Sequence, residues 1–167
     1  MRKLQIAVIG YNSDKSNSTT NKLAYEVGRA IARAKGTLIC GGLGGVMEKA
    51  CKGAKDQGGI TVGIIPQEDL SCANEYCDIV VASGIGYARD FLVATSADGI
   101  IVVGGGVGTL VELCVGYMLK KPIVTIPHSG GTAELYGGKY LDERKSILIT
   151  TARDADTAVQ FILNHTK

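Results

Sequence analysis

Aromatic residues and excess charge are scarce in this sequence. It has no tryptophan, two phenylalanines and a net charge of only +2 over 167 residues. Proteins that bind single-stranded nucleic acid stack bases on aromatic side chains, and duplex binders concentrate positive charge on one face. The sequence therefore predicts no nucleic-acid partner, and it lacks the basic cluster that holds a protein on an anionic membrane.

Long apolar runs are also missing. The first run, residues 4–9, ends at Gly10 and is too short for the apolar region of a signal peptide. No run approaches the ~20 apolar residues that cross a bilayer. The five cysteines are an odd number without matched spacing, which argues against a disulfide framework. We therefore expect a cytoplasmic protein with reduced thiols.

Metal-ligand patterns are absent too. Cys72 and Cys77 lie close together in sequence, but the two histidines, His128 and His165, are far from them. Zinc sites usually combine four cysteine or histidine ligands in closely spaced pairs. The sequence predicts no metal site.

Short apolar runs alternate with helical patterns along the whole chain. Seven runs read as strands, at residues 4–9, 37–40, 60–65, 78–82, 100–103, 122–126 and 146–150. Strands that are nearly continuous in valine and isoleucine are typical of parallel sheets covered on both faces. We expect an α/β fold, a Rossmann-like doubly wound parallel sheet of about seven strands, with residues 1–167 forming a single domain.

Glycine is abundant, with 23 residues, and two clusters follow strands directly. At the carboxyl end of a parallel strand, a glycine loop leading into a helix presents backbone N–H groups to an anion. The alternative is that these glycines only form tight turns. Neither cluster matches G-x-G-x-x-G or a Walker A loop, so NAD and ATP are not favoured. The predicted phosphate-binding residues are Gly41, Gly42, Gly44, Gly45, Val46, Gly105, Gly106, Gly108 and Thr109.

Two charged residues near the second glycine cluster are candidate catalytic residues. The apolar stripe of residues 107, 110, 111, 114, 115 and 118 is expected to face the sheet, which places Glu112 off that stripe, one turn beyond Gly108. Arg89 opens the preceding helix, and arginine binds phosphate through parallel N–H bonds. The alternative is that Glu112 is solvated on the helix surface and that Arg89 is a surface residue paired with Asp90 or Glu112.

Together these motifs resemble the Lonely Guy family, once labelled as lysine decarboxylases. Residues 86–115, GYARDFLVATSADGIIVVGGGVGTLVELCV, resemble its core signature, an arginine-bearing helix, a strand and P-G-G-x-G-T-x-x-E. Residues 40–59 resemble its second glycine loop. The resemblance covers about residues 1–150, and it assigns the arginine to Arg89 and the glutamate to Glu112.

The resemblance implies a homodimer that binds a nucleoside 5′-monophosphate or similar ligand, with no required cofactor. In the hydrolase branch the N-glycosidic bond is cleaved to free base and ribose 5-phosphate. Two departures, Gly104 for proline and Asp90 for lysine, resemble the branch of molybdenum-cofactor carriers, which bind a phosphorylated pterin. A nucleotide sensor is a third alternative. Lysine decarboxylation is not expected, because no lysine lies beside the glycine loops.

Overall fold

One parallel sheet forms the centre of the protein. The structure, a computed structural model, describes residues 2–166. The sheet has seven strands in the order β4-β3-β2-β1-β5-β6-β7, and every neighbouring pair is parallel. The strands are β1 (Gln5–Gly10), β2 (Thr37–Cys40), β3 (Ile60–Ile65), β4 (Ile79–Ala82), β5 (Gly99–Val103), β6 (Ile123–Thr125) and β7 (Thr150–Thr151). The order reverses between β1 and β5, which is where such sheets bind ligands.

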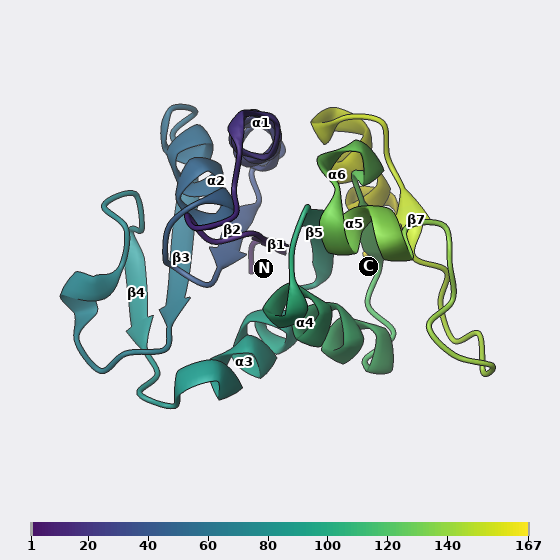
Figure 1. Cartoon of the computed structure of the whole chain (residues 1–167). Helices are drawn as coiled ribbons and strands as arrows, with labels where there is room; N and C mark the ends of the chain where they lie inside the picture. Colours follow the sequence, from purple (N-terminus) through teal and green to yellow (C-terminus); the bar gives the residue numbers. More distant parts are fainter. Residues whose placement is uncertain (1, 167) are drawn as a thin grey trace.

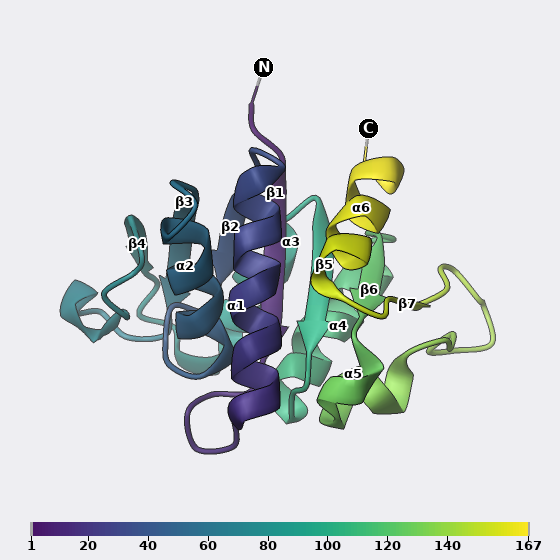
Figure 2. The ribbon, with the colours of Figure 1, turned by 90° about the horizontal axis from the view of Figure 1, so that it is seen from above.

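Helices cover both faces of the sheet (Figures 1 and 2). In Figure 1, α1 (Ser18–Arg33), α2 (Val46–Lys55) and α6 (Ala155–His165) lie above the strands. On the opposite face are α3 (Arg89–Ser96) and α4 (Val107–Met118), whereas the short α5 (Gly131–Tyr136) follows β6. The described residues also form three 3₁₀ turns, at Leu70–Cys72, Gly86–Ala88 and Pro127–Ser129.

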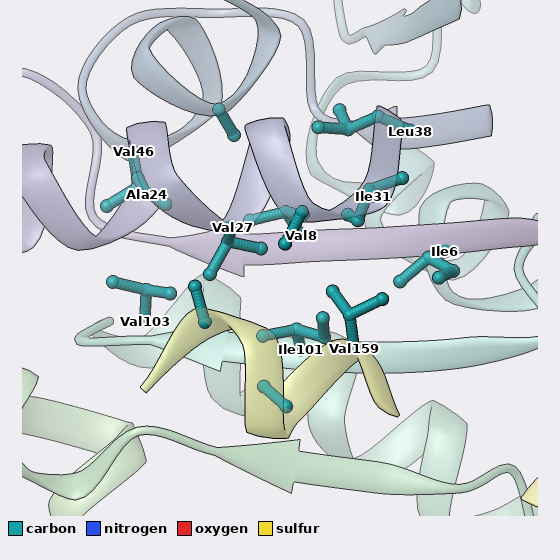
Figure 3. Packing of buried hydrophobic residues seen from close by; sticks show 14 of the residues in the cluster. Ile6, Val8, Ala24, Val27, Ile31, Leu38, Val46, Ile101, Val103 and Val159 are labelled. Carbon is teal, nitrogen blue, oxygen red and sulfur yellow. The ribbon is translucent and has the colours of Figure 1, made fainter. Parts of the chain in front are cut away.

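The alternation of side chains along the strands divides the core into two layers. Ile6 and Val8 of β1 point toward α1 and α6, where they pack with Val27 of α1 and Val159 of α6 (Figure 3). Their neighbours on β1 point to the other face and pack with residues of α3 and α4, since successive side chains of a strand alternate. The central strands are therefore buried on both sides, as their apolar sequences predict.

Helices α1 and α2 approach each other closely at two glycines. A Cβ atom on Gly28 would overlap the backbone carbonyl of Ala50, and one on Gly53 would overlap that of Tyr25. Both obstacles are backbone atoms, which cannot rotate away. This contact fixes α2, and with it the first glycine loop.

We expect Gly28→Ala to destabilise the protein by about 1–3 kcal/mol, the usual cost of forcing extra atoms into a packed core. Alanine favours helix by about 1 kcal/mol over glycine, so the net loss will fall at the lower end of that range. Urea unfolding measures it. The exposed substitution Lys22→Ala on the same helix is the control, and an equally stable Gly28→Ala protein would contradict the packing argument.

The predicted fold class, strand number and parallel order are confirmed, and two details of the sequence analysis are corrected. The last strand is only Thr150–Thr151 rather than residues 146–150. The stripe predicted to face the sheet is turned outward at its ends, with Val107 80% and Met118 66% exposed. The buried face of α4 instead carries Leu113, Gly116 and Tyr117, and at Gly116 a Cβ atom would overlap Ile100 of β5.

No helix among residues 2–166 combines the length and the apolar character needed to cross a membrane.

Candidate functional site

A cavity of about 390 Å³ opens at the carboxyl ends of the central strands. Its walls come from the loop after β1, the loop after β2, the start of α3 and the first turns of α4. This is the point where the strand order reverses, as expected for a ligand site in a doubly wound sheet. Six of the predicted site residues line it, Gly41, Arg89, Gly106, Gly108, Thr109 and Glu112.

The second glycine loop is held in a conformation that needs glycine. Gly104 and Gly105 have φ angles of +65° and +109°, which residues with a side chain rarely adopt. The N–H groups of Thr132 and Ala133, at the start of α5, donate to the carbonyls of Gly105 and Gly104. These carbonyls are turned toward α5, and the loop places the N-terminus of α4 at the cavity.

The N-terminus of α4 is suited to an anion. Its N-cap residue is Gly106, which has no side chain to cap the first turn. The N–H groups of a first turn have no partners inside the helix and carry a partial positive charge. Because Gly106, Gly108 and Thr109 all line the cavity, this end of the helix faces the space that a ligand would fill.

The first glycine loop contributes less of the wall. Gly41 lies on the cavity against the guanidinium of Arg89, where a Cβ atom would overlap it. Behind the wall, Gly44 and Gly45 pack against the loop after β1, and Gly42 packs against β3. Val46 is fully buried under Gly10, and Gly105 is enclosed by Thr109 and α5. Direct contact of these five residues with a ligand remains a prediction.

Three charged side chains meet in the cavity wall. Nη1 of Arg89 lies 3.0 Å from Oδ1 of Asp90 and 3.6 Å from Oε1 of Glu112. Asp90 and Glu112 are each only 6% exposed. The Nε group of Arg89 is buried and has no hydrogen-bond partner among the described residues. One guanidinium thus serves two buried carboxyl groups, and the site lacks the charge to hold both of them ionised.

Burial decides which carboxyl group keeps a proton. Loss of water and, to a smaller extent, the negative charge of Asp90 raise the pKa of Glu112 against the opposing charge of Arg89, and the net pKa is about 8. Burial also raises the pKa of Asp90, again opposed by Arg89. Asp90 is closer to Arg89, so it is the carboxyl group that ionises, and Glu112 is largely protonated at neutral pH.

This proton makes stability depend on pH. Below pH 4.5 Glu112 is neutral in both the folded and the unfolded chain, so its burial has no ionisation cost. Between pH 4.5 and about 8 the carboxyl group of Glu112 ionises only in the unfolded chain. Each rise in pH within this range therefore favours the unfolded state further. We expect the contribution of Glu112 to fall by about 4 kcal/mol over this range, at about 1.4 kcal/mol per pKa unit.

Urea unfolding of the wild type and Glu112→Gln at pH 5 and pH 8 measures this effect. As the pH rises from 5 to 8, the free energy of unfolding of Glu112→Gln should increase relative to that of the wild type. Subtracting one free energy of unfolding from the other removes the pH dependence of the titratable groups that the two proteins share. The same difference at both pH values would contradict the buried proton.

The loop after β1 is the part of the site that the sequence analysis did not assign. Tyr11, Asn12, Asp14 and Lys15 all line the cavity. The available signal was position, because this polar loop follows the strand at the centre of the sheet. Its composition, without glycine between Tyr11 and Thr20, lacks the feature that marked the other two loops. Asp90 was considered as a departure from a family pattern and as a surface partner of Arg89; the pair exists, but it is buried.

Solved structures of similar sequence share the whole fold. A molybdenum cofactor binding protein from Rippkaea orientalis is 31% identical, with a TM-score of 0.86 and 98% of each chain covered. The molybdenum cofactor carrier protein of Chlamydomonas reinhardtii is 32% identical, with a TM-score of 0.85 and the same coverage. Both similarities extend over the loops that form the cavity.

A phosphoribohydrolase is also similar in sequence. The cytokinin riboside 5′-monophosphate phosphoribohydrolase of Mycobacterium tuberculosis is 37% identical over 115 residues, which are 63% of this chain and 61% of that protein. The profile of the SLOG cluster4 family matches residues 3–158. The chain therefore belongs to the SLOG cluster4 family and is related to the Lonely Guy phosphoribohydrolases.

Proposed function

We propose that the protein binds a nucleoside 5′-monophosphate in the cavity and hydrolyses its N-glycosidic bond. The observation that carries this proposal is the buried Glu112, whose pKa is raised by its burial, beside the exposed N-terminus of α4. The helix end suits the phosphate, and the carboxyl group one turn further along suits the next part of the ligand. The name of the Mycobacterium tuberculosis relative supports the same reaction.

The two carboxyl groups divide the chemistry between them. Cleavage of a glycosidic bond passes through a state in which the ribose carries positive charge. Ionised Asp90 stabilises that charge, and Glu112 donates its proton to the departing base. Water forms the new bond to the ribosyl carbon, and its proton restores the acid. Arg89 keeps Asp90 ionised and positions the sugar phosphate.

Transport of a phosphorylated pterin is the second candidate. It is favoured by the two cofactor-binding structures, which match 98% of the chain, and by Gly104, where the hydrolase pattern has proline. The same anion site would hold the pterin phosphate, and no bond would be cleaved. Sensing of a nucleotide without turnover remains a third alternative.

The proposal includes a cytoplasmic homodimer. Apolar side chains are exposed on α3 and α4, which lie side by side on one face (Figure 1). Tyr87 (93% exposed) and Val107 belong to both this face and the cavity rim, so a second copy would also cover the site. Light scattering after gel filtration tests this, and we expect Phe91→Glu with Met118→Glu to yield a monomer. Dimers that persist in that variant would exclude this face.

The proposed activity is tested with purified protein and AMP, GMP, CMP, UMP and IMP, each separated by chromatography and assayed for free base. Release of base from at least one nucleotide is the expected result. A thermal shift with phosphorylated pterin or nucleotide, but no free base from any of the five, would overturn hydrolysis and favour the carrier. The matching nucleosides without phosphate are the control, since the anion site predicts that they react poorly.

A further inference from the structure

Three cysteines from separate parts of the chain meet behind the first glycine loop. Cys40 ends β2, Cys51 lies on α2 and Cys77 precedes β4. Their sulfur atoms all lie within 4.8 Å of one another. The Sγ atoms of Cys40 and Cys51 are 3.4 Å apart, and those of Cys51 and Cys77 are 4.0 Å apart. Cys72 and Cys114 lie outside this group, which we call the thiol cluster.

The surroundings of the thiol cluster fit sulfur atoms that act as ligands. The N–H of Gly42 donates to Sγ of Cys40 at 3.3 Å, a contact that stabilises a thiolate. Strand β3 has a glycine, Gly63, opposite Cys77, and a Cβ atom there would come within 2.6 Å of the sulfur. Cys40 and Cys51 are buried and Cys77 is half-buried, which leaves one side of the cluster accessible from solvent.

The number and spacing of the sulfurs indicate the metal. A metal ion about 2.3 Å from each of three sulfurs in one plane holds them about 4 Å apart, close to the spacing observed here. Structural zinc requires four ligands, and no histidine, carboxylate or fourth cysteine among residues 2–166 joins the group. Thiolates select soft ions, and monovalent copper is the soft ion that three sulfurs satisfy.

We propose that Cys40, Cys51 and Cys77 bind one monovalent copper ion. Binding replaces thiol protons with the metal and changes no oxidation state, so it requires no other reactant. The site is separate from the ligand cavity but adjoins it, because Cys40 is followed directly by Gly41, which lies against Arg89. The sequence predicted no metal site, because residues 40, 51 and 77 are far apart along the chain and match no recognised ligand spacing.

The test is an anaerobic titration of reduced protein with the coloured complex of monovalent copper and bicinchoninate. We expect the wild type to remove one copper ion per chain. Cys77→Ser, the least buried member, should weaken binding at least about 100-fold through loss of one of three soft ligands. Cys72→Ser and Cys114→Ser are matched controls that should bind like the wild type. X-ray absorption should show three sulfurs and no nitrogen or oxygen.

Folding of the variants is checked by circular dichroism and thermal unfolding, and Cys40→Ser provides a second variant if Cys77→Ser unfolds. Failure of the folded wild type to compete with bicinchoninate would overturn the proposal. Copper that remains bound in both cluster variants would overturn it as well, as would its loss in Cys72→Ser. An equal concentration of divalent zinc should leave the copper bound, and its displacement by zinc would exclude a three-sulfur site.

Discussion

Glu112→Gln will strongly slow the release of free base and leave ligand binding within a few-fold of the wild type. Glutamine has nearly the same shape, and at neutral pH it replaces a carboxyl group that is already largely uncharged, so the cavity and its charge are preserved. It has no proton acidic enough for the departing base. We expect the rate to fall at least about 100-fold, the lower part of the range for loss of a general acid.

Base release at saturating nucleotide gives the rate, and a thermal shift with the same nucleotide reports binding. The control is Glu134→Gln, which makes the same chemical change on an exposed residue of α5 and should leave both measurements unchanged. Unchanged turnover in Glu112→Gln would remove Glu112 from the mechanism. Loss of binding together with turnover would instead identify it as a ligand contact.

Arg89→Met will destabilise the protein by about 3–5 kcal/mol, the usual result of removing one partner of a buried ion pair. Methionine fills much of the same volume, but Asp90 then lies buried without a cation 3.0 Å away. The double substitution Arg89→Met, Asp90→Asn should recover most of the loss, because it also removes the unpaired charge.

Urea unfolding of the wild type, both single variants and the double variant completes a thermodynamic cycle. The surface pair Arg153 and Asp154 is 3.1 Å apart with Arg153 almost fully exposed, so Arg153→Met should cost at most about 1 kcal/mol. If Arg89→Met and Arg153→Met lowered the free energy of unfolding equally, Arg89 would have no structural role. Additive effects of the two substitutions at positions 89 and 90 would show that those side chains do not interact.

The sequence predicted the sheet well because the strands are nearly continuous runs of buried valine and isoleucine, and such runs need little context. Both glycine loops were located for the same reason, since each follows such a strand, whereas Arg89 and Glu112 were selected from their helix positions and the family resemblance, and their catalytic role stays a prediction. The direction in which α4 faces was not predictable. The face that carries Leu113, Gly116 and Tyr117 is buried, whereas the apolar stripe suggested a different face.

The remaining parts of the site depend on distances across the fold. Proximity of Asp90 to Glu112 depends on how α3 packs against α4, and the raised pKa depends on burial that no helical pattern states. Likewise, Cys40, Cys51 and Cys77 come together only because β2, α2 and the segment before β4 are neighbours. Such contacts cannot be inferred from the spacing of residues along the sequence.

The pairing of β1 with β5 has a consequence for how the chain is synthesised. Ile6 pairs with Gly99, so β1 waits for this central neighbour until all the residues between them have emerged from the ribosome. Until then β1 can pair only with β2, and its other side is an open edge of a largely apolar strand, the kind of surface that recruits other chains. Nascent chains that stall before β5 are therefore the aggregation-prone species, and β1 is the strand most in need of chaperone protection.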